Sequence, residues 1–228
     1  MSNGKNMKIG LIGFGIMGQA LAKMAPAKGH TLSAIISRSL PSPPQNQLSS
    51  IDLFYDFSSH TALDENLSLA ASLKKPLLIG TTGGKIDPKA LDDFAKKYGI
   101  ALFHASSFSI GAHLFLQLVE KASALLDKGF DQCLIEEHQK TKKDAPSGMG
   151  LLIKQATGKE KLDIHSIRLG GSLPSHSLLF DSPSERITLN HTAKSRDPFA
   201  EGALLAGEWL IGKVGFYTME DFLNDYLA

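Results

Sequence analysis

Cysteine is almost absent from this chain, which has one, Cys133, among 228 residues. A single cysteine cannot form a disulfide within the chain, so the small disulfide-stapled folds of secreted proteins are excluded. The start of the sequence, MSNGKNMKIG, also has no apolar signal-peptide run. We therefore expect the protein to work in the reducing cytoplasm.

An excess of charge of either sign is also missing. Lysine and arginine together number 24, and aspartate and glutamate 23, which gives a formal net charge of +1. Proteins that bind nucleic acid or membrane surfaces usually need a broad basic field, and no stretch approaches the roughly 18 apolar residues that cross a bilayer. We expect neither nucleic acid nor membrane as a partner, but a small molecule.

The first hundred residues alternate between apolar runs and amphipathic stretches. A strand, a glycine turn, a helix and a second strand are expected between residues 7 and 39, followed by strands at 51–57, 75–79 and 100–104 and helices at 62–73 and 87–98. Strands that alternate with helices predict right-handed crossovers and a parallel sheet. Residues 40–50, LPSPPQNQLSS, are rich in proline, and we expect a surface loop without a helix there.

The pattern changes after residue 109, where strands follow one another without helices between them. Helices are expected at 111–128, 147–157 and 199–211, strands at 131–138, 163–169, 175–181 and 184–193, and a short terminal helix in GFYTMEDFLNDYLA that packs back on the first domain. Consecutive strands predict a mixed or antiparallel sheet. The expected fold class is α/β: a doubly wound parallel-sheet domain plus a second α+β domain.

A glycine-rich turn, GxGxxG, lies between the first strand and the helix that follows it. Its residues are Gly13, Phe14, Gly15, Ile16, Met17 and Gly18. In dinucleotide-binding proteins the first glycine allows the tight turn, the second admits the pyrophosphate and the third lets the helix pack on the strand. The free N–H groups of the helix also attract the anion. This context favours a nucleotide site over a purely structural turn.

The end of the second strand distinguishes the two nicotinamide cofactors. NAD-binding proteins usually place an acidic residue about 20 positions beyond the glycines, whereas this chain has Ser37, Arg38 and Ser39. A guanidinium can pair with a 2′-phosphate, and a serine can donate to it. We expect NADPH, with NADH as a second choice. The alternative is that Arg38 is a solvated loop cation.

A run of small residues, Gly80, Thr81 and Thr82, follows the strand expected at 75–79. The carboxyl edge of a doubly wound sheet is where its ligands bind. These residues can therefore approach the nicotinamide ribose, although an ordinary strand-to-helix turn is the better explanation when this run is taken alone.

The segment EEHQKTKKDAPSGMG, residues 136–150, combines groups that can move protons and hold anions. His138 ends a strand, and Lys142 follows four residues later. An imidazole exchanges a proton near neutral pH, and an ammonium can donate one or bind a carboxylate. Free N–H groups at the start of the next helix can hold a carboxylate: those of Ser147, Gly148 and Met149. The segment predicts a small dianionic substrate, and the alternative is a solvated lysine-rich loop.

The motif EHxxxKxDAPSG, together with the glycine turn, GTTG, FSIGAHLF at 108–115 and HTAKSRDPFAEGA at 191–203, resembles the 4-hydroxy-tetrahydrodipicolinate reductase family. That family reduces a cyclic imine dicarboxylate with NAD(P)H on the path to diaminopimelate and lysine. The resemblance implies a dinucleotide-binding domain over residues 1–108 and 197–228. It also implies a substrate-binding and oligomerisation domain over 109–196, whose sheet builds a homotetramer.

The resemblance assigns roles to individual residues as well. His138 would be the general acid/base and Lys142 the proton donor. The other substrate contacts would be Gln139, Ser147, Gly148, Met149 and Arg196. The cofactor would also touch Gly80, Thr81, Thr82, Ala105, Ser106, Ser107 and Phe108.

Four positions depart from the family pattern. Gln139 stands where a second histidine is frequent, Met149 where threonine is usual, and Ser107 where asparagine is usual. In the pattern RxGxxxGxH, which begins at Arg168, Pro174 replaces a glycine. These changes bear on substrate affinity and cofactor preference rather than on reaction class.

Two other functions stay open. The motif GFGIMG also suits a β-hydroxyacid-type dehydrogenase, although the consecutive strands after residue 163 argue against the all-α second domain of that class. A non-catalytic module that senses NADP(H) would not need both His138 and Lys142. We expect no metal site, because several histidines show no metal-ligand spacing: His30, His60, His104, His113 and His165. Glu136 and Glu137 either orient His138 or face solvent.

Overall fold

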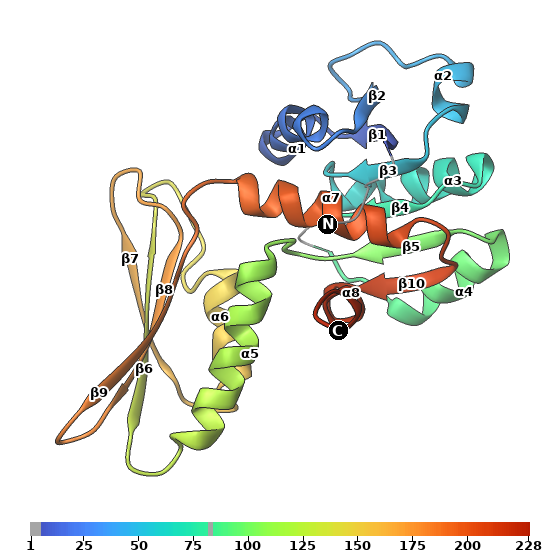
Figure 1. The fold of residues 1–228 in the computed structure, drawn as a ribbon. Helices are drawn as coiled ribbons and strands as arrows, with labels where there is room; N and C mark the ends of the chain where they lie inside the picture. Colours follow the sequence, from blue (N-terminus) through green and yellow to red (C-terminus); the bar gives the residue numbers. More distant parts are fainter. Residues whose placement is uncertain (1–5, 82–83) are drawn as a thin grey trace. The chain divides into compact units, whose positions relative to one another are not determined.

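The computed structural model describes residues 6–81 and 84–228 (Figure 1). Contacts between residues divide the chain into two compact units, Met1–Ser109 with Arg196–Ala228, and Ile110–Ser195. The boundaries expected from the sequence lie one residue away, and Arg196 belongs to the first unit. Within the described ranges, no helix combines the length and apolar character that crossing a membrane requires.

The first unit is built on a six-stranded parallel sheet with the strand order β10-β5-β4-β3-β1-β2. The strands are β1 (Lys8–Ile12), β2 (Thr31–Ile36), β3 (Leu53–Asp56), β4 (Leu77–Ile79), β5 (Ala101–His104) and β10 (Gly215–Thr218). The helices are α1 (Ile16–Ala27), α2 (Gln45–Ser49), α3 (Leu63–Leu73), α4 (Pro88–Tyr98), α7 (Asp197–Leu210) and α8 (Met219–Tyr226). A 3₁₀ turn, His60–Ala62, precedes α3.

Helices cover both faces of this sheet. One core cluster places apolar side chains of α2, α3 and α4 against Phe54 and Leu77 of the sheet. On the opposite face, Gly207 of α7 lies against Leu53 and Tyr55, and α7 packs on α1. Neighbouring residues of β3 therefore serve opposite faces, and every residue of the strand is buried. The predicted doubly wound parallel sheet is confirmed.

The prediction that residues 40–50 contain no helix is wrong. The short helix α2 follows Pro44, whose extended backbone (φ −68°, ψ 152°) leads into the first turn. Leu48 is buried in the core cluster, and the Gln47 side chain donates to the Ser33 carbonyl at 2.5 Å. Tertiary packing of one apolar side chain thus stabilises a helical turn in a segment whose composition is typical of a loop.

The predicted terminal helix is present, but the strand β10 that precedes it was not predicted. This strand pairs in parallel with β5, with Gly215 opposite Ala101 and Thr218 opposite His104. The expected helix, α8, follows it and begins with a capping box formed by Thr218 and Asp221. A strand of four residues is too short for an apolar pattern to be recognised in the sequence. Its pairing with β5 identifies residues 215–218 as a strand.

The second unit is built on a four-stranded mixed sheet with the order β7-β6-β8-β9. Its elements are α5 (Ile110–Leu125), β6 (Asp131–His138), α6 (Gly148–Ala156), β7 (Asp163–Arg168), β8 (Ser175–Asp181) and β9 (Arg186–Thr192). The central strand β6 pairs in parallel with β7 and antiparallel with β8, which pairs antiparallel with β9. The predicted mixed sheet is confirmed.

Both helices of this unit lie on one face of its sheet (Figure 1). Leu134 of β6 and Leu178 of β8 are fully buried there, in a core that includes Phe115 of α5 and Ile153 of α6. Side chains alternate across a strand, so Glu136 of β6 shares the helix-covered face with Leu134. The alternate residues of β6 and β8 point to the opposite face and are half-exposed: Cys133, Ile135, Ser177 and Leu179.

Candidate active site

The glycine turn of the first unit packs so closely that side chains are excluded at its two ends. Gly13 has φ +88°, and a Cβ there would lie 2.6 Å from the carbonyl group of Phe57. The Gly13 N–H donates to the Ile36 carbonyl at 2.9 Å. A Cβ on Gly18 would overlap the Gly13 carbonyl oxygen. Only glycine at both positions lets α1 approach the strand ends this closely.

Gly15, between these two, faces open space instead. A Cβ at Gly15 would have no atom within 4 Å. Gly15 is the N-cap of α1, and neither a capping side chain nor an acidic residue occupies the first turn. Phe14 and Ile16 on either side are exposed. Free N–H groups beside unfilled space fit a bound pyrophosphate, so these residues can hold the dinucleotide that the motif predicts.

The segment after β2 carries hydroxyls and a cation. The Ser37 and Ser39 hydroxyl oxygens lie 2.9 Å apart. Arg38 is exposed, and the ion pairs found among the described residues do not include it. The guanidinium is thus available to an anionic ligand.

The carboxyl edge of the first sheet is lined by aromatic rings at the ends of β3 and β5. Phe57 and Phe108 meet edge to face, with ring centroids 5.9 Å apart. A Cβ on Gly80 would overlap the Phe57 ring and lie 3.0 Å from that of Phe108. Thr81 is buried, and its hydroxyl has no hydrogen-bond partner among the described residues. This unsatisfied hydroxyl is a group that a ligand at the edge can bond.

Of the remaining residues predicted to touch the cofactor, some are buried in the core and others are exposed at the surface. Ala105 and Phe108 are buried, whereas Ser106 is exposed and Ser107 half-exposed. Thr82 lies outside the described residues. The four positions of 105–108 therefore differ in their access to a ligand.

In the second unit, a buried carboxylate organises the end of β6. Glu136 has no exposed surface. Its Oε1 accepts hydrogen bonds from the Ser166 hydroxyl at 2.8 Å and from Nη2 of Arg168 at 2.8 Å. Its Oε2 accepts from the N–H of Ser147 at 2.9 Å and from the Ser147 hydroxyl at 2.5 Å. Burial alone would raise the pKa of Glu136, but these hydrogen bonds lower the pKa to about 2.

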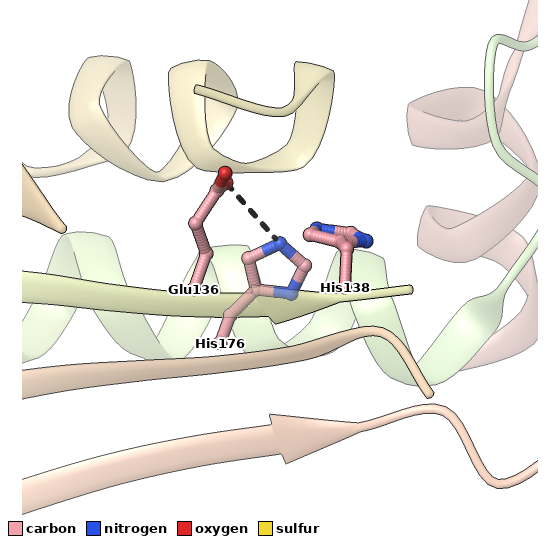
Figure 2. A group of neighbouring side chains, drawn as sticks. All are labelled: Glu136, His138 and His176. Atoms are coloured by element: carbon pink, nitrogen blue, oxygen red, sulfur yellow. Dashed lines mark ion pairs between the residues drawn. The ribbon is translucent and has the colours of Figure 1, made fainter. Parts of the chain in front are cut away.

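Two histidines stand next to this carboxylate on the same face of the sheet (Figure 2). His138 follows Glu136 on β6, and His176 lies directly opposite Glu136 on β8. The two imidazole rings meet edge to face, with centroids 5.1 Å apart. Burial lowers the pKa of His138, although the charge of Glu136 opposes this. Burial, with a contribution from neighbouring His138, lowers the pKa of His176 to about 4.

Each of the two histidines also has one ring nitrogen that makes no hydrogen bond among the described residues. His138 Nε2 and His176 Nδ1 are both buried and have no hydrogen-bond partner among the described residues. His138 is 7% exposed and His176 2% exposed. Burial favours the neutral form of both rings, and a neutral imidazole can accept a proton at its unprotonated nitrogen.

Lys142 lies in the loop that follows β6. Its Nζ donates to both carboxylate oxygens of Asp144, at 2.8 and 2.9 Å. The Asp144 carbonyl oxygen in turn accepts from Nη2 of Arg168 at 2.6 Å. The ion pair lowers the pKa of Asp144. The loop therefore carries a fixed ammonium close to the end of the strand that bears His138.

The N-terminus of α6 closes this group of residues. Ser147 is the N-cap, and its hydroxyl accepts from the Gly150 N–H at 3.0 Å. Because the Ser147 N–H and hydroxyl already bond Glu136, the free donors of the first turn belong to Gly148 and Met149. Gly148 is exposed, and a Cβ at this position would have no atom within 4 Å. A ligand carboxylate fits there.

Glu136, His138 and His176 also form a group that could offer metal ligands. One donor atom from each lies within 4.8 Å of the others. Both oxygens of Glu136 already accept hydrogen bonds, however, and one of the donors is the Arg168 guanidinium. A cation at this place would compete with Arg168, so the arrangement is a hydrogen-bonded network, and we assign no metal to it.

The structure brings together some predicted residues and adds others. His138, Lys142, Ser147, Gly148 and Met149 all lie in the second unit around the end of β6, and Gln139 is exposed beside them. Arg196 lies in the first unit, exposed at the start of α7, with its guanidinium 6.0 Å from the centre of the Phe199 ring. The sequence allowed Glu136 to orient His138 and placed His176 on the same sheet, but it did not predict that Glu136, Arg168 and His176 form one network. Strand alternation, which places Glu136 on the face of Leu134, could have indicated that Glu136 is buried.

A parallel sheet with an open glycine turn defines the class of dinucleotide-binding proteins. Two family models cover most of the chain: residues 7–108 match "Dihydrodipicolinate reductase, N-terminus", and residues 111–223 match "Dihydrodipicolinate reductase, C-terminus". The chain belongs to the dihydrodipicolinate reductase family, and it is an oxidoreductase that uses a pyridine nucleotide. The resemblance inferred from the sequence motifs is confirmed.

Individual relatives agree with this assignment. A 4-hydroxy-tetrahydrodipicolinate reductase of Thermosipho africanus is 35% identical over 228 residues, which cover 96% of this chain and 99% of that protein. The protein of the same name from Zymomonas mobilis is 35% identical, with 98% and 100% covered. A dipicolinate-bound dihydrodipicolinate reductase from Paenisporosarcina sp. TG-14 has the same fold, with a TM-score of 0.78, 21% identity, and 95% and 99% of the chains covered.

Proposed function

We propose that this chain reduces 4-hydroxy-tetrahydrodipicolinate to tetrahydrodipicolinate, the substrate for which its 35%-identical relatives are named. The observation that carries the proposal is the grouping of His138, Lys142 and the open first turn of α6 around the end of one strand. When bound, the reduced nicotinamide supplies the hydride. The substrate also takes up one proton and loses its hydroxyl as water.

The residues of the second unit handle the proton and the carboxylates. His138 acts as general acid/base through its Nε2, which is buried and has no hydrogen-bond partner among the described residues. Lys142 donates a proton or neutralises a carboxylate, and the N–H groups of Gly148 and Met149 bind a carboxylate at the positive end of α6. Gln139 supplies an amide contact. Ser147, whose donors bond Glu136, holds this turn in place.

The first unit adds one substrate contact and the cofactor site. Arg196, exposed at the start of α7, is proposed to bind a substrate carboxylate with its guanidinium. The cofactor's pyrophosphate is assigned to the turn from Gly13 to Gly18. Its nicotinamide end is assigned to the edge formed by Gly80, Thr81 and residues 105–108.

We also propose a homotetramer in the cytoplasm. The face of the second sheet opposite its helices carries half-exposed apolar side chains, including Ile135 and Leu179. An apolar strand face of this kind favours burial against another copy of the chain. The unpaired thiol of Cys133 suits a reducing compartment.

The activity can be tested by following absorbance at 340 nm. The imine is generated in situ, and purified protein is added with NADPH or with NADH. Loss of absorbance that depends on both the imine and the protein is the expected result. Binding of NADPH without oxidation would contradict the proposal and favour a cofactor-sensing module.

Arg38→Ala is expected to raise the KM for NADPH by about ten- to a hundredfold, because a charge-assisted hydrogen bond to the 2′-phosphate is lost. The KM for NADH should stay the same, since NADH has no 2′-phosphate. Initial rates with each nucleotide measure both values.

Lys23→Ala, which removes an exposed cation from α1, is the matched control and should change neither KM. Equal effects of Arg38→Ala on the two nucleotides would show that Arg38 does not contact the 2′-phosphate.

A further inference from the structure

We propose that Glu136 is a positioning residue, which holds the first turn of α6 and the His176 ring and thereby places His138 and the Gly148 and Met149 amides for the substrate. This inference rests on the proposed function, and it goes beyond it by giving a role to two buried side chains and one partly buried side chain that no step of the reaction uses directly. Those side chains are Glu136, Arg168 and His176.

Glu136 joins three elements of the second unit. The carboxylate lies on β6, and its partners Ser166 and Arg168 lie on the neighbouring strand β7. Its third partner, Ser147, is the cap of α6. Gly150 also packs against it, since a Cβ on Gly150 would lie 2.5 Å from Glu136 Oε2. One buried carboxylate therefore sets where α6 begins relative to the strand that carries His138.

The hydrogen bonds of the Ser147 hydroxyl determine which nitrogen of His176 carries the proton. The single hydroxyl hydrogen of Ser147 goes to Glu136 Oε2, at 2.5 Å. The hydroxyl oxygen accepts from the Gly150 N–H at 3.0 Å, and its remaining lone pair faces His176 Nε2 at 3.2 Å. His176 must therefore donate from Nε2. Its Nδ1 is left without a hydrogen, buried and without a hydrogen-bond partner among the described residues, and the ring is neutral.

Charged groups of both signs face His138. Glu136 on β6 provides the negative charge inside the network, and Asp144 in the loop provides a second one. Arg168 on β7 and Lys142 in the loop are positive. The neutral His176 on β8 contacts the His138 ring, and His191 on β9 lies opposite His176. Removing the charge of Glu136 leaves the two cations dominant, which disfavours the protonated form of His138.

The test compares Glu136→Gln with the wild type. Glutamine keeps the shape but turns one acceptor oxygen into an NH₂ donor, which faces the donors of Ser147, Ser166 and Arg168. Because buried donors are then left unsatisfied, we expect the KM for the imine to rise about tenfold or more, with an unchanged KM for NADPH. The limb of the kcat/KM against pH profile that reports His138 should move to lower pH.

Two further variants separate charge from structure. Asp127→Asn makes the same chemical change at an exposed carboxylate of the same unit, which pairs with Lys159, and should move neither value. Ser147→Ala removes the link to His176 but keeps the charge of Glu136. It should raise the KM for the imine without moving the pH limb. A Glu136→Gln enzyme with the wild-type KM and pH profile would overturn the proposal.

The tautomer of His176 can be measured in the unaltered protein, so the inference does not depend on whether a variant folds. Two-bond ¹⁵N–¹H spectra of the imidazoles, assigned with His138→Gln and His176→Gln, should show His176 as the neutral Nε2–H form at pH 6. An Nδ1–H tautomer, or a doubly protonated ring at that pH, would refute the network. If the wild type does not reduce the imine, the proposed function fails, while this measurement still decides the geometry.

Discussion

Lys142→Ala should lower kcat for imine reduction by about a hundredfold to ten-thousandfold, the range that one proton-transferring group contributes. The Nζ of Lys142 is held at 2.8 Å from Asp144 and lies in the loop after His138, so its loss removes a fixed ammonium from the end of the strand that bears that imidazole. The Kd for NADPH should stay the same, because the nucleotide site belongs to the first unit. Steady-state rates and fluorescence titration with NADPH measure the two quantities.

Lys143→Ala is the matched control for this experiment. Lys143 is the next residue of the same loop, is exposed, and forms none of the ion pairs found among the described residues. It should keep nearly full activity. Turnover of Lys142→Ala close to that of Lys143→Ala would remove Lys142 from the proton-transfer step.

Gly15→Asp should weaken NADPH binding by about a hundredfold or more while leaving the fold intact. No atom lies within 4 Å of a Cβ at this position, so the new side chain fits. Its carboxylate, however, would cap the N-terminus of α1 and face the place proposed for the pyrophosphate, where like charges cost several kcal/mol. Aspartate is also a better N-cap than glycine, so the Tm should stay the same or rise slightly.

Gly15→Asn separates charge from size, because asparagine caps the helix with nearly the same shape. It should weaken binding less than Gly15→Asp does, as measured by titration at the same ionic strength. A Gly15→Asp protein that binds NADPH as tightly as the wild type would show that the pyrophosphate lies elsewhere.

Much of the first unit could be predicted from the sequence because its signals are local. The strand, glycine turn and helix between Lys8 and Ala27 follow one another directly, and Gly13 and Gly18 leave no room for a Cβ. In the second unit, the strands β6 and β8 were predicted with their observed ends, because both alternate in burial over seven or more residues. The expected boundaries of the other elements were less accurate.

Short elements could not be predicted in this way. The helix α2 depends on the burial of Leu48 against the sheet, and the strand β10 depends on pairing with β5, more than 100 positions earlier in the chain. Neither is long enough to show a period of its own. Both are products of tertiary packing.

In the candidate site, too, the local features could be predicted from the sequence and the long-range contacts could not. The class of fold, the glycine turn and the placing of His138 and Lys142 near a helix start could all be read from the amino-acid sequence, because those features depend on residues close together in the chain. The pairing of Glu136 with donors of other elements could not be predicted from the sequence. Its partners lie 11 to 32 residues away, on α6 and β7, and a carboxylate can leave water only where such donors meet it.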